Sequence, residues 1–378
     1  MRRRSWAWRA AAVASGCTLA LGVAGCGSDS SSSGDTNTGG GGGAEVELTL
    51  AYVTTQQHPY GQAVDYFIDE VNKASNGRIK ITGLPSYPNP EPQLLSDVRA
   101  GSVEMGTIST AIWDSAGINS FQALQAPFLV SNYGLEGQIL EGDIGTAMAD
   151  DASTKAGDIV VLSVHEGGLR KPLGAKKKFT NPASFKGAKI RAPGSKVLAE
   201  GLQALGAEAD PLPLPEVYQA LKNGTVDGME ANLGLIATNK YYEVAKYVTG
   251  NVNFWPFPTA LTINKKTFDA LSADDQKILT DAAAKVPAKS LEIVSAPSQL
   301  PQALVDCGVE FVTATDADKA ALAKAADVAV TALSKADATT ADFIKQIQDL
   351  KASAAPPAAP PPFPTKKSAP DAKCTLGG

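Results

Sequence analysis

A regular alternation of short strands and amphipathic helices, from residue 46 to residue 109, constrains the fold of this chain most strongly. Apolar and β-branched residues, which favour strands, dominate three stretches: VELTLAYV, RIKITGL and VEMGTIS. Apolar residues at helical spacing fill the two segments between them, GQAVDYFIDEVNKASNG and PQLLSDVRAG, each of which ends in glycine. A β-α-β-α-β order predicts a parallel sheet with helices on its faces.

Beyond residue 109, the sequence continues to predict short strands and helices. Strands are expected in DIVVLSVHEG, GLRKPLGAKK, AKIRA and TVDGME, and one long strand in TGNVNFWPFPTALTINK. Helices are expected in SKVLAEGLQALG, LPEVYQALKNG, NLGLIATNKYYEVA and two Ala-rich regions, 266–298 and 315–351. A length of 378 residues favours two domains over one, and 44% hydrophobic residues supply a real core.

The first 25 residues resemble an export signal. Four arginines precede AAAVASGCTLALGVAG, which is too short and too rich in alanine for a good membrane span. The signal ends in VAGC, which resembles a bacterial lipobox, where a peptidase cuts before Cys26 and a diacylglycerol is attached to its thiol. We therefore expect lipidation at Cys26. An ordinary secreted protein is the alternative, and the export route, Sec or twin-arginine, is left open.

The mature chain is acidic and begins with a polar linker. Residues 28–43, SDSSSSGDTNTGGGGG, cannot bury apolar surface and predict a flexible tether. Removal of the signal leaves 30 Lys and Arg against 39 Asp and Glu, which argues against nucleic acid as a partner. No later segment is apolar enough to span a bilayer, so we expect an extracytoplasmic protein that is anchored to the cell membrane by its lipid.

Two cysteines remain in the mature chain besides Cys26. An even pair of thiols outside the cell favours one disulfide, here between Cys307 and Cys374, with two free thiols as the alternative. The Pro/Ala-rich tail at 353–374 would be disordered without an anchor, and Cys374 is the obvious one.

The stretch FKGAKIRAPGS contains an arginine at the end of an expected strand. Alternation places Ala188 and Ile190 on one face and Lys189 and Arg191 on the other, just before a proline stops the strand. Ligands of open α/β sheets bind beyond the carboxyl ends of the strands, where Arg191 lies. A surface arginine paired with a nearby acid is the alternative.

Several motifs in order carry a resemblance to a known family. They are KIRAP, then LQALGAEADPLPLPEVYQALKNGTVDGMEANL, YYEVAKYV and TALTINKKTFDALSADDQKIL, preceded by HPYGQAVDYFIDEVNKASNGRIKI, EPQLLSDVRAGSVEMGTIS and FQALQAPFL. From about residue 46 to about residue 285, the chain resembles the solute-binding proteins of TRAP transporters, the DctP type. The resemblance implies capture of a small organic anion and its delivery to the permease subunits of a TRAP-type transporter in the membrane.

The resemblance also implies an α/β, two-domain, periplasmic-binding-protein-like fold, with a hinge of crossing strands and a ligand cleft between the domains. The expected divisions are a signal peptide at 1–25, the lipidated cysteine and linker at 26–44, domain I at 45–166 with 256–298, domain II at 167–255 with 299–352, and the tail at 353–378.

Ligand residues follow from the resemblance one by one. The arginine of the KIRxP motif, here Arg191, forms the carboxylate clamp, and a guanidinium suits a carboxylate because it donates two parallel hydrogen bonds. Arg170 falls where many members carry a second arginine. The asparagine that often follows VDGxE is replaced here by Ala231, so Asn232 is a candidate whose reach is left open. Other candidates are Tyr52, His58, Ser109, Thr110, Trp113, Trp255 and Phe257. The aromatic candidates predict a carboxylate on a partly apolar body rather than a C4-dicarboxylate.

Catalytic and metal-binding patterns are missing from the sequence. The family resemblance implies structural roles for Asp227, in a turn, and for Glu230, as an orienter of Arg191. Neither His58 nor His165 has metal-ligand spacing. We therefore expect no enzyme and no cofactor. A ligand sensor for a membrane signalling partner is the alternative function, and a surface hydrolase is the third.

Overall fold

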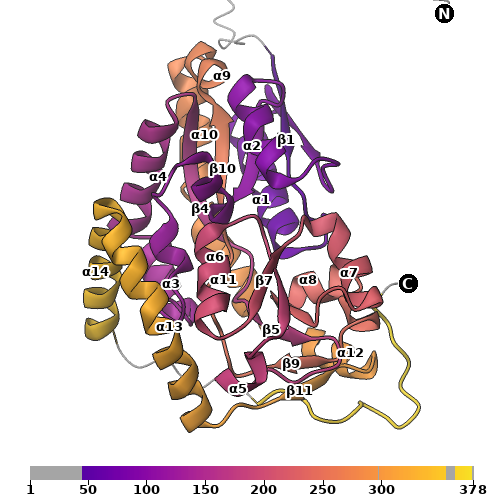
Figure 1. The fold of residues 1–378 in the computed structure, drawn as a ribbon. Helices are drawn as coiled ribbons and strands as arrows, with labels where there is room; N and C mark the ends of the chain where they lie inside the picture. Colours follow the sequence, from indigo (N-terminus) through magenta and orange to yellow (C-terminus); the bar gives the residue numbers. More distant parts are fainter. Residues whose placement is uncertain (1–44, 297, 355–361, 377–378) are drawn as a thin grey trace, which may run out of the picture. The chain divides into compact units, whose positions relative to one another are not determined.

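The computed structural model describes residues 45–296, 298–354 and 362–376. They form a mixed α/β structure with two β-sheets (Figure 1). The expected signal peptide, Cys26 and the linker lie outside the described residues. Within the described ranges, no helix combines the length and the apolar character that a membrane crossing requires.

The first sheet has five strands in the order β2-β1-β3-β10-β4. β1 runs parallel to β2 and β3, whereas β10 runs antiparallel to β3 and β4. The parallel sheet predicted from residues 46–109 is therefore confirmed for β1, β2 and β3. β10 adds an antiparallel strand, because it returns from the second sheet in the opposite direction. The strands are β1 (Val46–Ala51), β2 (Ile79–Leu84), β3 (Met105–Ser109), β4 (Ile159–Glu166) and β10 (Pro258–Asn264).

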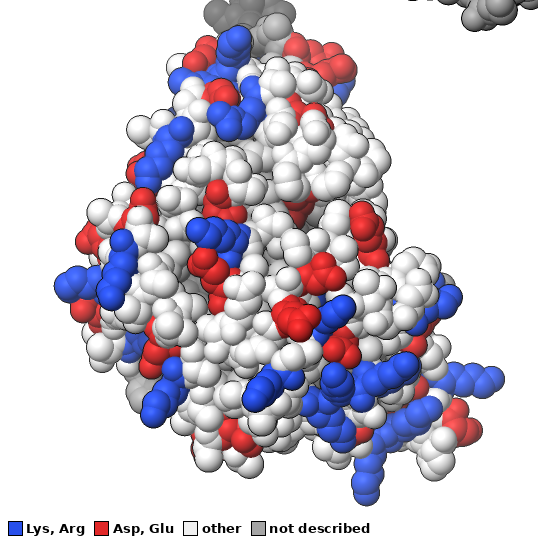
Figure 2. Space-filling view, in the orientation of Figure 1, with Lys and Arg blue, Asp and Glu red and all other residues white. Residues whose placement is uncertain are grey.

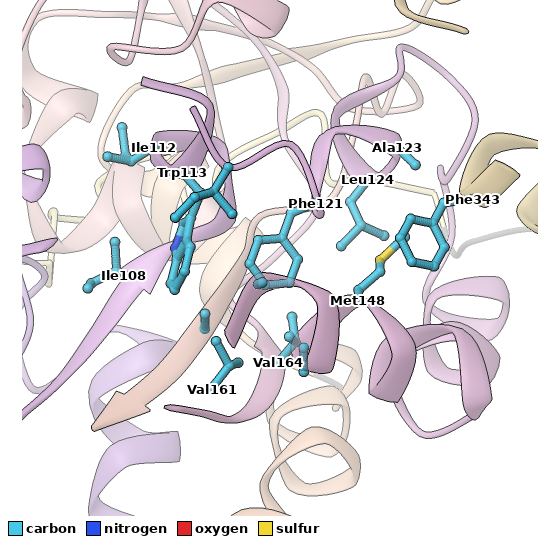
Figure 3. Close-up of a cluster of buried hydrophobic side chains, with 14 of the residues drawn as sticks. Ile108, Ile112, Trp113, Phe121, Ala123, Leu124, Met148, Val161, Val164 and Phe343 are labelled. Atoms are coloured by element: carbon cyan, nitrogen blue, oxygen red, sulfur yellow. The ribbon is translucent and has the colours of Figure 1, made fainter. Parts of the chain in front are cut away.

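Helices cover both faces of this sheet (Figure 1). Apolar residues of α1 and α10 pack on one face, around Leu50 and Leu261. On the other face, Trp113 and Phe121 pack edge to face with ring centres 5.3 Å apart, in a cluster that also holds Met148 and Phe343 (Figure 3). The elements around the first sheet are α1 (Pro59–Ala74), α2 (Glu91–Ala100), η1 (Thr110–Ala116), η2 (Gln122–Gln125), α3 (Tyr133–Leu140), α4 (Asp143–Ala156), α9 (Lys265–Ala270), α10 (Ala273–Ala283), α11 (Val286–Ser295) and α14 (Ala338–Ser353).

The second sheet has six short strands in the order β11-β9-β5-β8-β6-β7. β6 lies parallel between β7 and β8, and β5 runs antiparallel to β8 and β9. The strands are β5 (Lys171–Gly174), β6 (Lys189–Ala192), β7 (Glu208–Pro211), β8 (Gly228–Ala231), β9 (Tyr247–Thr249) and β11 (Glu310–Val312).

The helices of the second sheet are shorter than the sequence predicts. The helix expected over NLGLIATNKYYEVA breaks at Lys240, whose φ of 56° is left-handed, and continues as a separate turn. The elements are α5 (Pro182–Phe185), α6 (Lys196–Ala204), η3 (Leu214–Glu216), α7 (Val217–Asn223), α8 (Leu233–Thr238), η4 (Tyr241–Glu243), α12 (Leu300–Asp306) and α13 (Asp316–Ala336).

Two of the stretches of chain that run between the sheets lie side by side, and we call them the crossing segments: residues 166–170 and 254–258. Backbone bonds join them, from Arg170 N to Trp255 O at 2.9 Å and from Gly167 N to Phe257 O at 3.2 Å. The long strand expected here is wrong, because prolines at 256 and 258 donate no hydrogen bond and regular pairing begins only at β10. Gly168 has a φ of 120°, which favours glycine, and a Cβ there would lie 2.9 Å from Asn232.

The C-terminal tail lies along the edge of the second sheet. A disulfide joins Cys307 to Cys374, and the ring of Phe363 stacks on Phe311 with centres 4.5 Å apart. Ser368 donates its backbone N–H and its hydroxyl to the Asp306 carboxylate, at 2.8 and 2.7 Å. Lys and Arg side chains gather near this end of the molecule (Figure 2). The described part of the tail is therefore held by covalent, aromatic and polar contacts.

Loss of the disulfide should destabilise the protein. A cross-link between residues 67 apart restricts the unfolded chain, and Cys374→Ser should lower the free energy of unfolding by up to about 4 kcal/mol. Urea denaturation of the variant and the wild type measures the difference. Alkylation followed by intact-mass measurement without reductant checks the bond itself, and two alkylated thiols in the wild type would contradict the pairing.

Candidate functional site

Arg191 is a buried cation at the end of a strand. Its side chain leaves β6 one residue before Ala192, and Pro193 then ends the strand. Nε and Nη2 both donate to the carbonyl oxygen of Leu212, at 3.0 and 2.8 Å, whereas Nη1 makes no hydrogen bond to a described residue. Burial lowers the pKa of Arg191 and nearby Glu230 opposes that shift. An arginine nevertheless stays charged near neutral pH, so one face of the guanidinium can receive an anion.

Arg170 lies in one crossing segment and forms a buried ion pair. Its Nε pairs with Glu230 Oε2, its Nη2 donates to the backbone oxygen of Glu230 at 2.8 Å, and its Cζ lies 4.1 Å from the centre of the Phe257 ring. Exposed fractions of 2% for Arg170 and 0% for Glu230 show that both charges depend on each other for compensation. Nη1 of Arg170 has no hydrogen-bond partner in the described ranges.

Strand register explains why Glu230 pairs with Arg170, whereas the sequence interpretation gave it to Arg191. In the antiparallel pair, Lys171 lies opposite Ala231, so Arg170 and Glu230 are diagonal neighbours on one face. In the parallel pair, Arg191 lies beside Met229, so the next side chain, Glu230, points to the other face. The interpretation of Glu230 as an orienter of Arg191 is therefore corrected.

Both arginines line one pocket with a volume of about 150 Å³. A cavity of that size admits a molecule such as benzene, so a small organic ligand fits. Prolines make up much of its wall, at positions 90, 92, 193, 211, 213 and 215. The other lining residues are Val53, Thr54, Tyr87, Asn89, Glu91, Ile112, Gly194, Leu212, Leu214 and Phe257.

Glu91 is a pocket residue that the sequence reasoning missed. It begins α2, and its Oε1 accepts the backbone N–H of Ser109 at 2.9 Å. Burial raises the pKa of Glu91, whereas the Ser109 N–H and the charges of Arg191 and Arg170 lower it. Its position in the sequence could have indicated this, because Glu91 stands at the start of a helix in a βαβ unit. A helix start of this kind lies next to the end of the neighbouring strand.

Three predicted residues lie in a smaller recess that shares Arg170 and Phe257 with the main pocket: Ser109, Thr110 and Trp255. Thr110 donates its hydroxyl to Pro258 O at 3.1 Å and accepts from Gln125 at 2.9 Å. Because the Thr110 hydroxyl is already engaged at both ends, it holds the recess together, and the same crossing segment supplies Trp255 and Phe257 to its wall.

Four predicted residues line neither cavity: Tyr52, His58, Trp113 and Asn232. His58 caps α1 by accepting the Tyr60 N–H at Nδ1, so its Nε2 carries the proton toward Asn232 Oδ1 at 3.3 Å. Burial lowers the pKa of His58 to about 3, so this imidazole is neutral. Asn232 caps α8 by accepting the Leu235 N–H at 2.7 Å. Ligand contact by these four residues stays a prediction.

Metal-ligating side chains do not gather in this region. Among residues 45–296, 298–354 and 362–376, no group of three or more His, Cys, Asp or Glu side chains is arranged to hold a metal ion.

A family comparison matches most of the chain. Residues 50–336 match the DctP model, described as "Bacterial extracellular solute-binding protein, family 7". The chain belongs to this family. DctP-type proteins are the solute-binding proteins of TRAP transporters, so the recognition from the KIRAP and VDGME motifs is confirmed, and so is the prediction that the chain is not an enzyme.

Individual relatives agree with the family. The chain is 27% identical over 278 residues to the 2,3-diketo-L-gulonate-binding periplasmic protein YiaO of Escherichia coli, covering 71% of this chain and 81% of the relative. It is 28% identical over 277 residues to the C4-dicarboxylate-binding periplasmic protein DctP of Rhodobacter capsulatus, covering 72% and 82%.

Solved structures confirm the predicted two-domain fold. The sugar acid binding protein DctPAm of Advenella mimigardefordensis, in complex with galactonate, superposes with a TM-score of 0.73 at 27% identity, over 82% of this chain and 99% of that one. The position of each domain boundary in this chain stays a prediction.

The buried ion pair of this DctP-family protein should contribute strongly to its stability. Glu230→Gln leaves the Arg170 charge buried without its partner, so the free energy of unfolding should fall by about 3 kcal/mol. The matched control is Glu310→Gln, which removes an exposed partner of Lys178 on the same sheet and should cost less than about 1 kcal/mol. Urea denaturation measures both, and equal losses would contradict the assignment.

Proposed function

We propose that this chain is a lipid-anchored extracytoplasmic solute-binding protein that captures a small carboxylate and delivers it to the permease of a TRAP-type transporter. One observation carries the proposal. Arg191 is a buried guanidinium on a pocket wall, and among the described residues it forms no ion pair. A buried charge without an ion-pair partner is costly, and a ligand carboxylate would supply that partner.

The known ligands of relatives support a carboxylate. The relatives named above bind 2,3-diketo-L-gulonate and C4-dicarboxylates, and the solved relative holds galactonate. All three ligands are organic acids. The shared chemical group is the one that a guanidinium recognises through two parallel hydrogen bonds.

The pocket wall favours a ligand with an apolar body. Most of the lining residues other than the arginines are apolar, among them six prolines, Ile112, Leu212, Leu214 and Phe257. Arg170 is already neutralised by Glu230, and Glu91 brings a further carboxyl group. We therefore infer a monocarboxylate on a partly apolar or aromatic body, since a second carboxylate would meet no uncompensated cation at this pocket.

The lipid anchor is part of the proposal and rests on the sequence of residues 1–44. The VAGC motif and the polar linker after Cys26 support it. Two acyl chains on one glycerol hold a protein stably on a membrane, where a linker of Gly and Ser would let the folded body reach a permease.

Arg191→Ala should weaken ligand binding severely. Removal of one partner of a buried charge pair costs about 2 to 5 kcal/mol, or roughly thirty- to several-thousand-fold in affinity. Arg191→Lys keeps the charge but loses the planar fork, so binding should weaken substantially there too. Isothermal titration calorimetry with an acid identified by mass spectrometry of the purified protein measures the change.

The control for this experiment is Arg99→Ala, which removes a part-exposed arginine paired with Asp158 and should leave affinity unchanged. Circular dichroism checks that each variant folds. If folded Arg191→Ala binds within about threefold of the wild type, a difference under about 0.7 kcal/mol, then the carboxylate assignment fails.

Cys26→Ala tests the anchor separately. The variant has no thiol to lipidate at this position, so it should stay uncleaved or leave the membrane fraction. Cell fractionation and intact-mass measurement follow it. Unchanged mass and unchanged membrane association would refute lipidation without touching the ligand assignment.

A further inference from the structure

Glu166 holds the two crossing segments together through its side chain. It is the last residue of β4 and is fully buried. Its carboxylate accepts the backbone N–H of Gly168 in its own segment and the N–H of Phe257 at 3.2 Å in the other. One carboxyl group therefore binds both crossing segments.

A second carboxyl group, on α3, lies within interaction range of Glu166, and α3 itself contacts a crossing segment where the Leu169 N–H donates to the Tyr133 hydroxyl. Glu136 lies on α3 with an exposed fraction of 0%, and neither of its oxygens has a standard hydrogen-bond partner among the described residues. Burial raises the pKa of Glu136 well above its ordinary value, and the charge of Glu166 raises it further. Burial also raises the pKa of Glu166, but Glu136 and the backbone N–H groups oppose that shift. A charged carboxyl that is buried without a hydrogen-bond partner is costly, so Glu136 is the one of the two that favours the protonated form.

The surroundings offer no positive charge to compensate two carboxylates. In the described ranges, neither Glu136 nor Glu166 forms an ion pair with Lys or Arg. The titratable neighbours are all neutral: Tyr133, whose hydroxyl accepts the Leu169 N–H at 3.2 Å; Tyr60, whose hydroxyl donates to Phe257 O at 2.8 Å; and His165, whose pKa burial lowers to about 3. From α11, Ser290 contributes only a hydroxyl, which accepts the Glu166 N–H at 2.9 Å.

We propose that Glu136 and Glu166 form a proton-binding site that clamps the connection between the two sheets. In the protonated state, the Glu136 hydroxyl donates to the Glu166 carboxylate, and that carboxylate continues to accept from both crossing segments. When the proton leaves to solvent, two negative charges face each other in a buried site without a cation. The contact between α3 and the crossing segments then weakens.

The sign of the pH dependence follows from this arrangement. The folded protein keeps a proton that the unfolded chain releases at the ordinary pKa of glutamic acid. Between that value and the raised value in the folded state, each pH unit should lower the folding equilibrium constant by up to tenfold. Stability from this site is complete at low pH and is lost as pH rises.

Glu136→Gln is the decisive variant. Its amide keeps the shape and can donate to Glu166, but it does not titrate. In urea denaturation of the full mature chain between pH 5 and pH 9, the ratio of folding constants, variant over wild type, should rise steadily with pH. The matched control is Glu141→Gln, which changes an exposed carboxyl at the end of the same helix and should give a flat ratio.

Glu166→Gln gives the complementary result. It removes the charge that accepts from Gly168 and Phe257, so it should lower stability at every pH in this range. A ratio for Glu136→Gln that stays flat across the range would overturn the proposal. The proposal would also be overturned if Na⁺ or Ca²⁺, added at constant ionic strength, restored the stability that the wild type loses at pH 9. The two carboxylates would then bind a cation instead of a proton.

A measurement on the wild type keeps the test independent of variant folding. Carbon-13 NMR of glutamate side-chain carboxyls should show one group that titrates well above the ordinary range of glutamic acid, and this signal should disappear in Glu136→Gln. Ionisation of every glutamate within the ordinary range would overturn the proposal.

Discussion

The contact between the two crossing segments is the constraint on which the ligand site depends. Arg170 bonds through its backbone to Trp255 and through its side chain to Glu230, so one residue ties the connection to the second sheet. Glycine is needed at 168, because the positive φ and the closeness of Asn232 leave no room for a side chain. Arg170 and Phe257, which line the pocket, come from these paired segments.

The two arginines of the pocket have different tasks because their partners differ. Arg170 is compensated by the Glu230 carboxylate, so little of its charge remains to attract a ligand. Arg191 has only the carbonyl dipole of Leu212 as a partner for two of its nitrogens. A dipole compensates a buried charge less completely than an opposite charge does, which leaves Arg191 as the stronger attraction for an anion.

Local patterns in the sequence predicted features that depend on residues close together in the chain. They did not predict contacts that depend on how distant strands pair. The end of β6 at Arg191 follows from alternation and a proline, and the family follows from motifs such as KIRAP. The pairing of Arg170 with Glu230 depends on the register of β5 and β8, which no local pattern states. The burial of Trp113 against Phe121 likewise depends on how η1 packs on the sheet.

Three buried charged sites near the crossing segments are compensated in three different ways, and the kind of partner decides how each site behaves. The Arg170–Glu230 ion pair is hard to break, because either charge would be costly to keep buried without the other. A carbonyl partner at Arg191 leaves room for a ligand. The proton that we infer between Glu136 and Glu166 can leave to solvent, so this part of the connection would respond to pH. Such a division would let the acidity of the surroundings act on the link between the sheets through the Glu136–Glu166 site.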